Sequence, residues 1–263
     1  MKKILSMLGA VAGLLIATTA AAGPLVTQWS FSEKLAWTAA TFSSGTGTTS
    51  QSATTLSWGQ TGGSFGAGNR SGLDITNDTV NSTINTNGAP AVTNTITHYN
   101  NPIDASFSTL LSANLLNQLT LTPNLPSVGP SLPTQSINFN ISFKETPNTA
   151  PCGFPSTSVC DDIFVIDLGA LNNSFMYDGN TYFVSIFSTT NNLIPLDPLT
   201  CAAAGAATGC LGFQTLEGQN TPATFAFVIT SDVVTIPEPS ELALLAIGLL
   251  GLYFIRGRKS QKM

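Results

Sequence analysis

An unbroken alternation of polar and apolar residues runs through the segment SINFNISF, residues 136–143. In an extended strand successive side chains point to opposite faces, so a period of two marks a strand that is buried on one side. The apolar side chains would share one face: Ile137, Phe139, Ile141 and Phe143. The serine and asparagine side chains would share the other. The segment is therefore predicted to be a half-buried β-strand.

Similar strand signals recur along the chain. Runs of β-branched and aromatic residues bounded by Gly, Asn, Pro or Asp begin at Asp162 (DIFVIDL), Thr181 (TYFVSIF) and Thr224 (TFAFVIT). The segments VTQWSF and KLAWTAATF near the amino end carry the same kind of strand signal. Only Ser108–Leu121 could form a helix instead, and LTLTP favours strand at its end. Many short strands separated by turn residues predict an all-β, antiparallel, sandwich-like fold whose topology stays open.

The first 22 residues have the layout of a secretory signal. Lys2 and Lys3 precede an uncharged run that ends in three alanines, the last of which is Ala22. A cationic start, an apolar middle and small residues at the cleavage position are typical of such signals. We expect an N-terminal signal helix, export through the Sec translocon, and cleavage by signal peptidase after Ala22, which leaves Gly23 first. A membrane anchor that is never cut is the alternative.

Residues 242–255 near the carboxyl end are apolar or glycine at every position. As a helix this segment would span about 21 Å, less than the roughly 30 Å hydrocarbon core of a bilayer, so its length also allows a buried core helix. Four basic residues follow: Arg256, Arg258, Lys259 and Lys262. Because cations beside an apolar helix stay on the cytoplasmic side, and their long stems reach the interface, a single C-terminal transmembrane helix with a basic anchor is expected.

The segment before that helix contains Pro237, Glu238, Pro239 and Ser240. Each proline fixes its own φ and disfavours helix at the preceding residue, so an exposed, extended peptide is expected, which an enzyme can bind as an added strand. This motif, the apolar helix and the basic cluster, in that order over residues 235–263, resemble a PEP-CTERM sorting signal. The resemblance implies processing by an exosortase, a membrane-embedded cysteine transpeptidase-like enzyme of Gram-negative bacteria.

The chain has one histidine, His98, in the segment NTITHYNNPID. Thr97, His98 and Asn100 resemble the signature of the THxN family of PEP-CTERM proteins, and the segment CDDIFVID is in keeping with that family. The family name brings no activity with it. From its neighbours, His98 is predicted to be a structural imidazole at a sheet edge, sharing strand parity with Val92 and Ile96 and bonded to loop carbonyls.

Between the two ends, residues 23–234 are expected to form one β-rich extracytoplasmic domain, because no long charged or proline-rich linker and no internal repeat divides them. The early segment Ser43–Gly88 is rich in Gly, Thr and Ser, which predicts flexible loops or weakly held strands.

All four cysteines lie in this region as two local pairs. Four cysteines allow three pairings, and the short loops between neighbours favour Cys152–Cys160 and Cys201–Cys210 in an oxidising compartment. Metal binding is the alternative, although the spacings lack CxxC and no histidine lies nearby.

Residues 23–236 contain three basic and twelve acidic side chains, a net charge of −9, against −5 for the whole chain. Such a surface cannot neutralise phosphates, so neither nucleic acid nor an anionic membrane surface is expected as a partner. No GxSxG, HExxH, P-loop or dinucleotide motif occurs, and a single histidine offers little acid–base chemistry. We expect no enzymatic activity, no cofactor and no metal.

Two groups of residues could nevertheless supply oxygen ligands for Ca²⁺. They are Asp161, Asp162 and Asp167 after Cys160, and Asp74, Asn77 and Asp78. Neither group matches an EF-hand loop or a repeat-type calcium motif, so solvated turn residues are favoured. Whether Asp161, Asp162 and Asp167 bind calcium stays open from sequence.

The sequence thus predicts an exosortase substrate, anchored briefly in the inner membrane, cut near the Pro-Glu-Pro segment and then displayed at the cell surface or released into the extracellular matrix. Family resemblance implies a link to exopolysaccharide, a candidate partner, and to biofilm formation, so the main expectation is a structural matrix protein. A carbohydrate-binding module is the alternative, for which Trp29, Trp37 and Trp58 are candidate exposed aromatic residues, although tryptophan is more often a core residue. A secreted hydrolase is less favoured.

Overall fold

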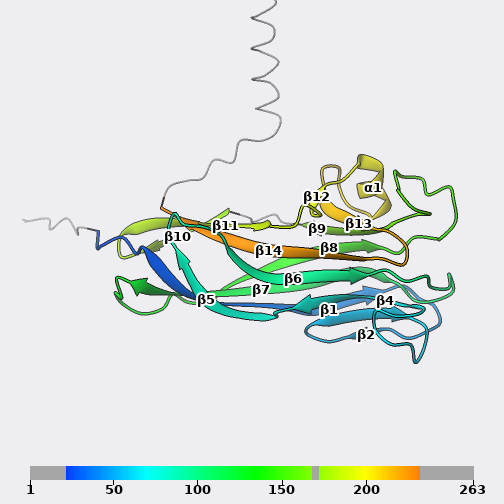
Figure 1. Cartoon of the computed structure of the whole chain (residues 1–263), viewed down its shortest axis with the longest axis horizontal. Coiled ribbons are helices and arrows are strands. Elements are labelled where there is room, and N and C mark those ends of the chain that lie inside the picture. The colour runs from blue at the N-terminus through cyan, green and yellow to red at the C-terminus, as the bar shows by residue number, and fades with distance from the viewer. Residues whose placement is uncertain (1–21, 168–171, 232–263) are drawn as a thin grey trace, which may run out of the picture.

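Two antiparallel β-sheets form the body of the protein in the computed structural model, which describes residues 22–167 and 172–231. Figure 1 shows them as two layers along the long axis of the molecule. From edge to edge, the first sheet contains β12 (Ile194–Pro195), β13 (Leu211–Thr215), β9 (Asp162–Asp167), β8 (Gln135–Lys144), β7 (Leu110–Leu125), β1 (Gln28–Phe42) and β5 (Thr79–Asn85).

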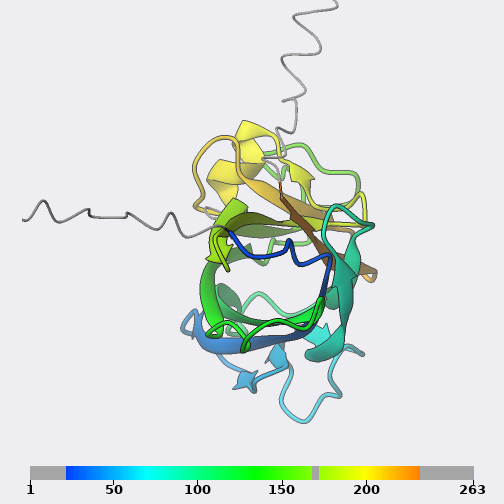
Figure 2. The same ribbon diagram turned by 90° about the vertical axis from the view of Figure 1, so that its left-hand side faces the viewer.

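The second sheet faces the first. From edge to edge, it contains β10 (Asn172–Tyr177), β11 (Asn180–Ser188), β14 (Asn220–Thr230), β6 (Ala91–Tyr99), β4 (Arg70–Thr76), β3 (Thr55–Gly59) and β2 (Ser50–Gln51). In the end view of Figure 2 the two sheets curl toward each other around a shared interior. The predicted all-β, antiparallel, sandwich-like fold is therefore confirmed.

The predicted half-buried strand at residues 136–143 is confirmed, because Phe139, Ile141 and Phe143 on β8 are buried in the interior. The helix alternative for Ser108–Leu121 is wrong, because that segment lies almost entirely in strand β7. Burial alternates along β7, and the strand is paired on both sides, with β1 and with β8. Alternate burial between two paired neighbours favours strand over the helix-forming tendency of its leucines.

The prediction of flexible loops or weakly held strands at Ser43–Gly88 is confirmed only in part, because the runs 43–49 and 60–69 are mostly loops and turns but the rest of the segment is not loosely held. This segment supplies β2, β3, β4 and β5, and it contributes Trp58, Leu73 and Ile84 to the buried interior. Its many threonines suit a pleated strand, and its glycines lie mostly at the turns. All three tryptophans are buried, with Trp29 and Trp58 0% and Trp37 3% exposed.

The interior contains two large apolar clusters. One includes Leu35, Trp37 and Leu115, and the other includes Phe31 and Leu119. Two polar residues lie between these clusters in the inward rows of their strands: Glu33 on β1, between Phe31 and Leu35, and Asn117 on β7, between Leu115 and Leu119. The core is therefore divided by a buried polar layer.

Strand β9 is buried on both faces, because a short helix, α1 (Pro198–Ala203), covers its outer side. Asp197 caps this helix by accepting a hydrogen bond from the Leu199 amide at 2.8 Å. The Cys201–Cys210 disulfide holds the helix beside β13. The Cys152–Cys160 disulfide closes a loop in the connection between β8 and β9. Both predicted disulfides are therefore confirmed.

The described residues contain no helix that is long and apolar enough to cross a membrane. The predicted signal helix, except for Ala22, and the predicted transmembrane helix at 242–255 lie outside the described ranges.

Candidate functional site

The segment Thr97–Asn100 lies along and just beyond the end of β6, a central strand of the second sheet. His98 is on β6, which pairs with β4 on one side and β14 on the other, and its side chain is 0% exposed. The prediction of a histidine at a sheet edge is therefore wrong. The expected parity with Val92 fails too, because residues 93–94 oppose the single residue Phe225 in a β-bulge, which turns Val92 outward.

Asn100 ties the end of β6 to the turn between β13 and β14. Its side-chain amide donates to the Thr215 carbonyl at 2.9 Å, and its backbone amide donates to the Gln219 carbonyl at 3.0 Å. Thr97 points the other way and is only half-buried. The three residues therefore have different roles: Thr97 lies toward the outer face, His98 reaches into the core, and Asn100 joins the end of β6 to the β13–β14 turn.

The imidazole of His98 packs among aromatic rings. Its ring lies 4.9 Å from that of Phe143, edge to face, and 6.1 Å from that of Trp58, stacked. Its Nε2 is 3.8 Å from Oδ2 of Asp162, and neither ring nitrogen has a hydrogen-bond partner among the described residues. The expected bonds to loop carbonyls are therefore wrong. Burial lowers the pKa of His98 to about 3, so the ring is neutral at neutral pH.

Asp162, beside His98, interacts with the charges of two further acids, and we call Glu145, Asp162 and Glu217 the carboxyl cluster. Trp58 donates its indole N–H to Glu145 at 2.6 Å. Thr146 donates its amide, at 2.8 Å, and its hydroxyl, at 3.2 Å, to the Oδ1 of Asp162. These contacts connect β3 of the second sheet with the β8–β9 connection of the first.

Burial raises the pKa values of the cluster. The pKa of Glu145 rises to about 7, because burial outweighs its hydrogen bonds with Trp58 and Asp162. Burial and the nearby charge of Glu145 raise the pKa of Asp162 well above its ordinary value. The pKa of Glu217 is raised by burial too, against smaller opposing contacts with Asn148 and the Gly218 amide. Two close carboxyls cannot both ionise cheaply, so each of Glu145 and Asp162 makes ionisation of the other less favourable.

The prediction of solvated turn acids fails for Asp161 and Asp162, which are 1% and 0% exposed. Asp161 accepts hydrogen bonds from the backbone amides and the hydroxyls of Thr157 and Ser158. Burial raises the pKa of Asp161, but these bonds outweigh it and hold the pKa below its ordinary value. Its oxygens therefore stabilise the Cys152–Cys160 loop.

The acids that could supply Ca²⁺ ligands make contacts within the fold in both groups. Among the described residues, no three or more His, Cys, Asp or Glu side chains are arranged to hold a metal ion. In the second group, Asp74 accepts a hydrogen bond from the Thr55 hydroxyl at 3.2 Å, and Asn77 takes a positive φ of 56° in the turn between β4 and β5. Turn formation and strand pairing account for these residues.

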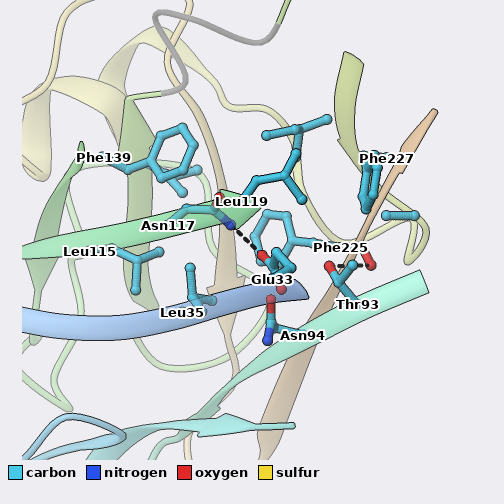
Figure 3. A pocket seen from close by; sticks show the side chains of 13 residues that line it. Glu33, Leu35, Thr93, Asn94, Leu115, Asn117, Leu119, Phe139, Phe225 and Phe227 are labelled. Atoms are coloured by element: carbon cyan, nitrogen blue, oxygen red, sulfur yellow. Dashed lines mark hydrogen bonds between the residues drawn. The ribbon is translucent and has the colours of Figure 1, made fainter. Parts of the chain in front are cut away.

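A second buried polar group lies in the layer that divides the core. Figure 3 shows Glu33 between Asn117, which donates a hydrogen bond to it, and Asn94 of β6. These residues line a small cavity of about 30 Å³. Burial raises the pKa of Glu33 to about 7, against the smaller effect of hydrogen bonding with Asn117 and Asn94. The neutral form of Glu33 is thus strongly favoured relative to that of a solvated glutamate.

The sequence analysis missed buried Glu33 and also half-buried Glu145 and Glu217, whose carboxyl oxygens include buried atoms. A signal existed for Glu33, because it shares strand parity with the apolar residues around it on β1. Glu145 and Glu217 lie just beyond strand ends, where an acid ordinarily predicts a solvated turn. Since His98 and Asp162 are 0% exposed, a substrate could contact them only if the sheets separated.

The residues expected to direct sorting lie outside the described ranges: Pro237, Glu238, Pro239, Ser240, Arg256, Arg258, Lys259 and Lys262. No protein-family model and no curated protein sequence matches this chain.

Proposed function

We propose that the chain is an exported exosortase substrate, cut near Ile236–Ser240 and then kept at the cell surface or in the extracellular matrix as a structural protein. The observation that carries the proposal is the order of three sequence elements in residues 235–263: a Pro-Glu-Pro segment, which is expected to be extended, an apolar stretch and a basic cluster. A peptide of this kind suits an enzyme that binds an extended strand at the membrane surface.

The two disulfides support an exported location, because such bonds persist in oxidising compartments and are rare in reducing ones. A structural role is supported by the burial of the titratable groups. His98 and Asp162 face the interior between the sheets, where they contact protein groups rather than solvent. Exopolysaccharide remains the candidate partner of the displayed protein.

The sorting proposal is tested by two variants of the full chain expressed in an exosortase-containing host. Replacing Pro237 and Pro239 by alanine removes both φ restraints and should leave an uncut protein in the membrane fraction. Replacing the four basic residues of the tail by glutamine should weaken anchoring, so that protein escapes with its tail attached. Pro133→Ala, an exposed proline in the β7–β8 connection, is the matched control.

Intact-mass analysis of the secreted and membrane-bound proteins reads both results. A released wild-type protein that still carried residues 242–255 would contradict the sorting proposal. A host that lacks the exosortase should accumulate uncut wild-type protein, which separates this enzyme from an unrelated protease.

Carbohydrate binding is the second candidate, and one observation favours it. Asn114, Asn138 and Asn140 are exposed on the outer face of the first sheet. Beside them, a hollow of about 470 Å³ is lined by Asn140, Ser142, Asp167 and residues 206–211. Amide and carboxyl groups can bond to sugar hydroxyls, although the buried tryptophans provide no stacking surface.

A glycan array probed with the whole exported protein tests this candidate. The paired change Asn138→Ala and Asn140→Ala should abolish any binding, whereas Asn81→Ala on edge strand β5 should leave it unchanged. Binding that survives the paired change would place the sugar elsewhere.

A further inference from the structure

The start of the described chain is hydrogen-bonded to a hairpin of the opposite sheet. The backbone N–H of Gly23 donates to the carbonyl of Asp178 at 2.8 Å. The carbonyl of Gly23 accepts from the side-chain amide of Asn180 at 2.9 Å. Asp178 and Asn180 belong to the turn between β10 and β11, at the end of the molecule where the chain enters in Figure 1.

The turn itself has a fixed geometry. Tyr177 and Asn180 are paired across the hairpin, and the two residues between them have positive φ values, 47° at Asp178 and 77° at Gly179. Asp-Gly in this conformation forms the two-residue turn that best suits the twist of a β-hairpin. The position of the Asp178 side chain therefore follows from a well-defined backbone.

The carboxylate of Asp178 lies directly against Gly23. A β-carbon added to Gly23 would be 1.7 Å from Oδ2 of Asp178, so the oxygen occupies the space of a side chain. A β-carbon on Gly179 would be 2.9 Å from the α-carbon of Ala22. Both residues flanking the expected cleavage position are thus in contact with the turn.

We infer that this turn is a binding site for the new amino terminus that is formed when the leader is removed after Ala22. Hydrolysis of the Ala22–Gly23 peptide bond adds water: the carboxyl group leaves with the leader, and the Gly23 amine takes up a proton. The single N–H of the peptide becomes an ammonium group with three donors. One keeps the bond to the Asp178 carbonyl, and another faces the carboxylate of the same residue.

The inference rests on the proposed export and on cleavage after Ala22. Its consequence is that processing strengthens the fold, because the ammonium of Gly23 ties the chain that enters β1 to the β10–β11 hairpin of the second sheet. A neighbouring contact acts in the same direction, since the Val26 amide donates to the Tyr182 hydroxyl at 2.8 Å. Before cleavage, the peptide nitrogen carries no charge to attract Asp178.

A thermodynamic cycle tests the site with chains that run from Gly23 to Met263, purified in detergent without passing through export. The α-amino group is either free or acetylated, and residue 178 is either Asp or Asn. Acetylation should lower the Tm by about 2–4 °C when Asp178 is present, as expected for one partly exposed ion pair. It should have no effect in the Asp178→Asn background.

Asp78→Asn is the matched control, because Asp78 is an exposed acid in the turn that connects β4 of the second sheet with β5 of the first, and acetylation should lower the Tm in this variant as in the wild type. An equal effect of acetylation with Asp178 and with Asn at position 178, or no effect in either, would overturn the inference.

Gly23→Ala provides a second test inside the exporting host. Signal peptidase should cut this variant as before, but the β-carbon should displace the Asp178 carboxylate and lower the Tm of the mature protein. The intact mass of the exported wild-type protein reports the cleavage position separately. A failure of export or cleavage can therefore be distinguished from an absence of the interaction between the Gly23 ammonium and Asp178. A mature protein that begins at another residue would overturn the inference.

Discussion

His98 and Asp162 meet across the interface between the two sheets, with Nε2 of the imidazole 3.8 Å from Oδ2 of the carboxyl group. One comes from β6 and the other from the first position of β9, and both side chains are 0% exposed. Burial lowers the pKa of the histidine to about 3 and raises that of the aspartate. At neutral pH the imidazole is therefore uncharged, and the two groups do not form an ion pair.

The contribution of His98 to stability should come mainly from packing. His98→Ala removes a ring that contacts Trp58 and Phe143, and it should lower the free energy of unfolding by about 2–4 kcal/mol, as for other large-to-small changes in a core. Thr97→Ala on the opposite, half-exposed face should cost well under half of that. Urea unfolding at pH 7 measures both. Full stability of His98→Ala would contradict this packing role.

Because the folded-state pKa of His98 lies below the ordinary value of 6.5, its contribution is fully present above that pH and declines as the pH falls toward 3. In this window the unfolded chain binds the extra proton, which favours unfolding by about 1.4 kcal/mol per pH unit. His98→Gln should lack this slope. Unfolding free energies at pH 4, 5, 6 and 7 for the two proteins should differ by a pH-dependent amount, and parallel curves would refute the assignment.

Glu145 should change the pH dependence of stability in the opposite direction to His98. Its folded-state pKa is raised from 4.5 to about 7, so the folded protein holds the extra proton between these values, and stability falls as the pH rises through this window. Glu145→Gln should remove the decline and keep the bond from Trp58. We expect the variant to gain about 1–3 kcal/mol relative to wild type between pH 4.5 and 8. Denaturant titrations over this range are the measurement.

Glu33 offers the same test in the middle of the core. Burial raises its pKa from 4.5 to about 7, so its contribution to stability is also lost as the pH rises between those values. Glu33→Gln should be close to wild type at pH 5 and more stable at pH 8.5, by about 1–2 kcal/mol. Glu33→Leu is informative in addition, because it removes the partner of Asn117 and should destabilise at every pH. A pH-independent effect of Glu33→Gln would be inconsistent with a buried, titrating carboxyl.

Each disulfide closes a short loop, with sequence separations of 8 and 9 residues. Loops of this length should contribute about 2–3 kcal/mol each through the unfolded state. Replacing Cys201 and Cys210 by alanine should also speed hydrogen exchange in α1, because that bridge holds the helix over β9. Replacing Cys152 and Cys160 should leave α1 protected. Non-reducing peptide mapping that found a bond from Cys152 to Cys201 would contradict both expectations.

Several features of this fold could be predicted from local pattern. The strand at 136–143 follows from its strict alternation, because only an extended chain places every second residue on one face. The disulfide pairs follow from short loop closure. The strands within Ser43–Gly88 were harder to predict, because Thr and Ser suit both loops and the polar face of a strand. Only the pairing of β3 with β4 and of β4 with β6 decides between the two.

The sequence by itself determined the class of fold and marked out Thr97–Asn100 as a segment of interest, because strand periodicity and short motifs are local properties. It also fixed the residues of the expected sorting tail. Only the tertiary structure decided the environment of the titratable groups. Glu33, His98 and Asp162 lie on different strands, and their pKa values depend on how completely the two sheets exclude water around them. Burial of this kind arises from contacts between residues far apart in the chain, such as His98 with Asp162 and Gly23 with Asp178, which no local pattern encodes.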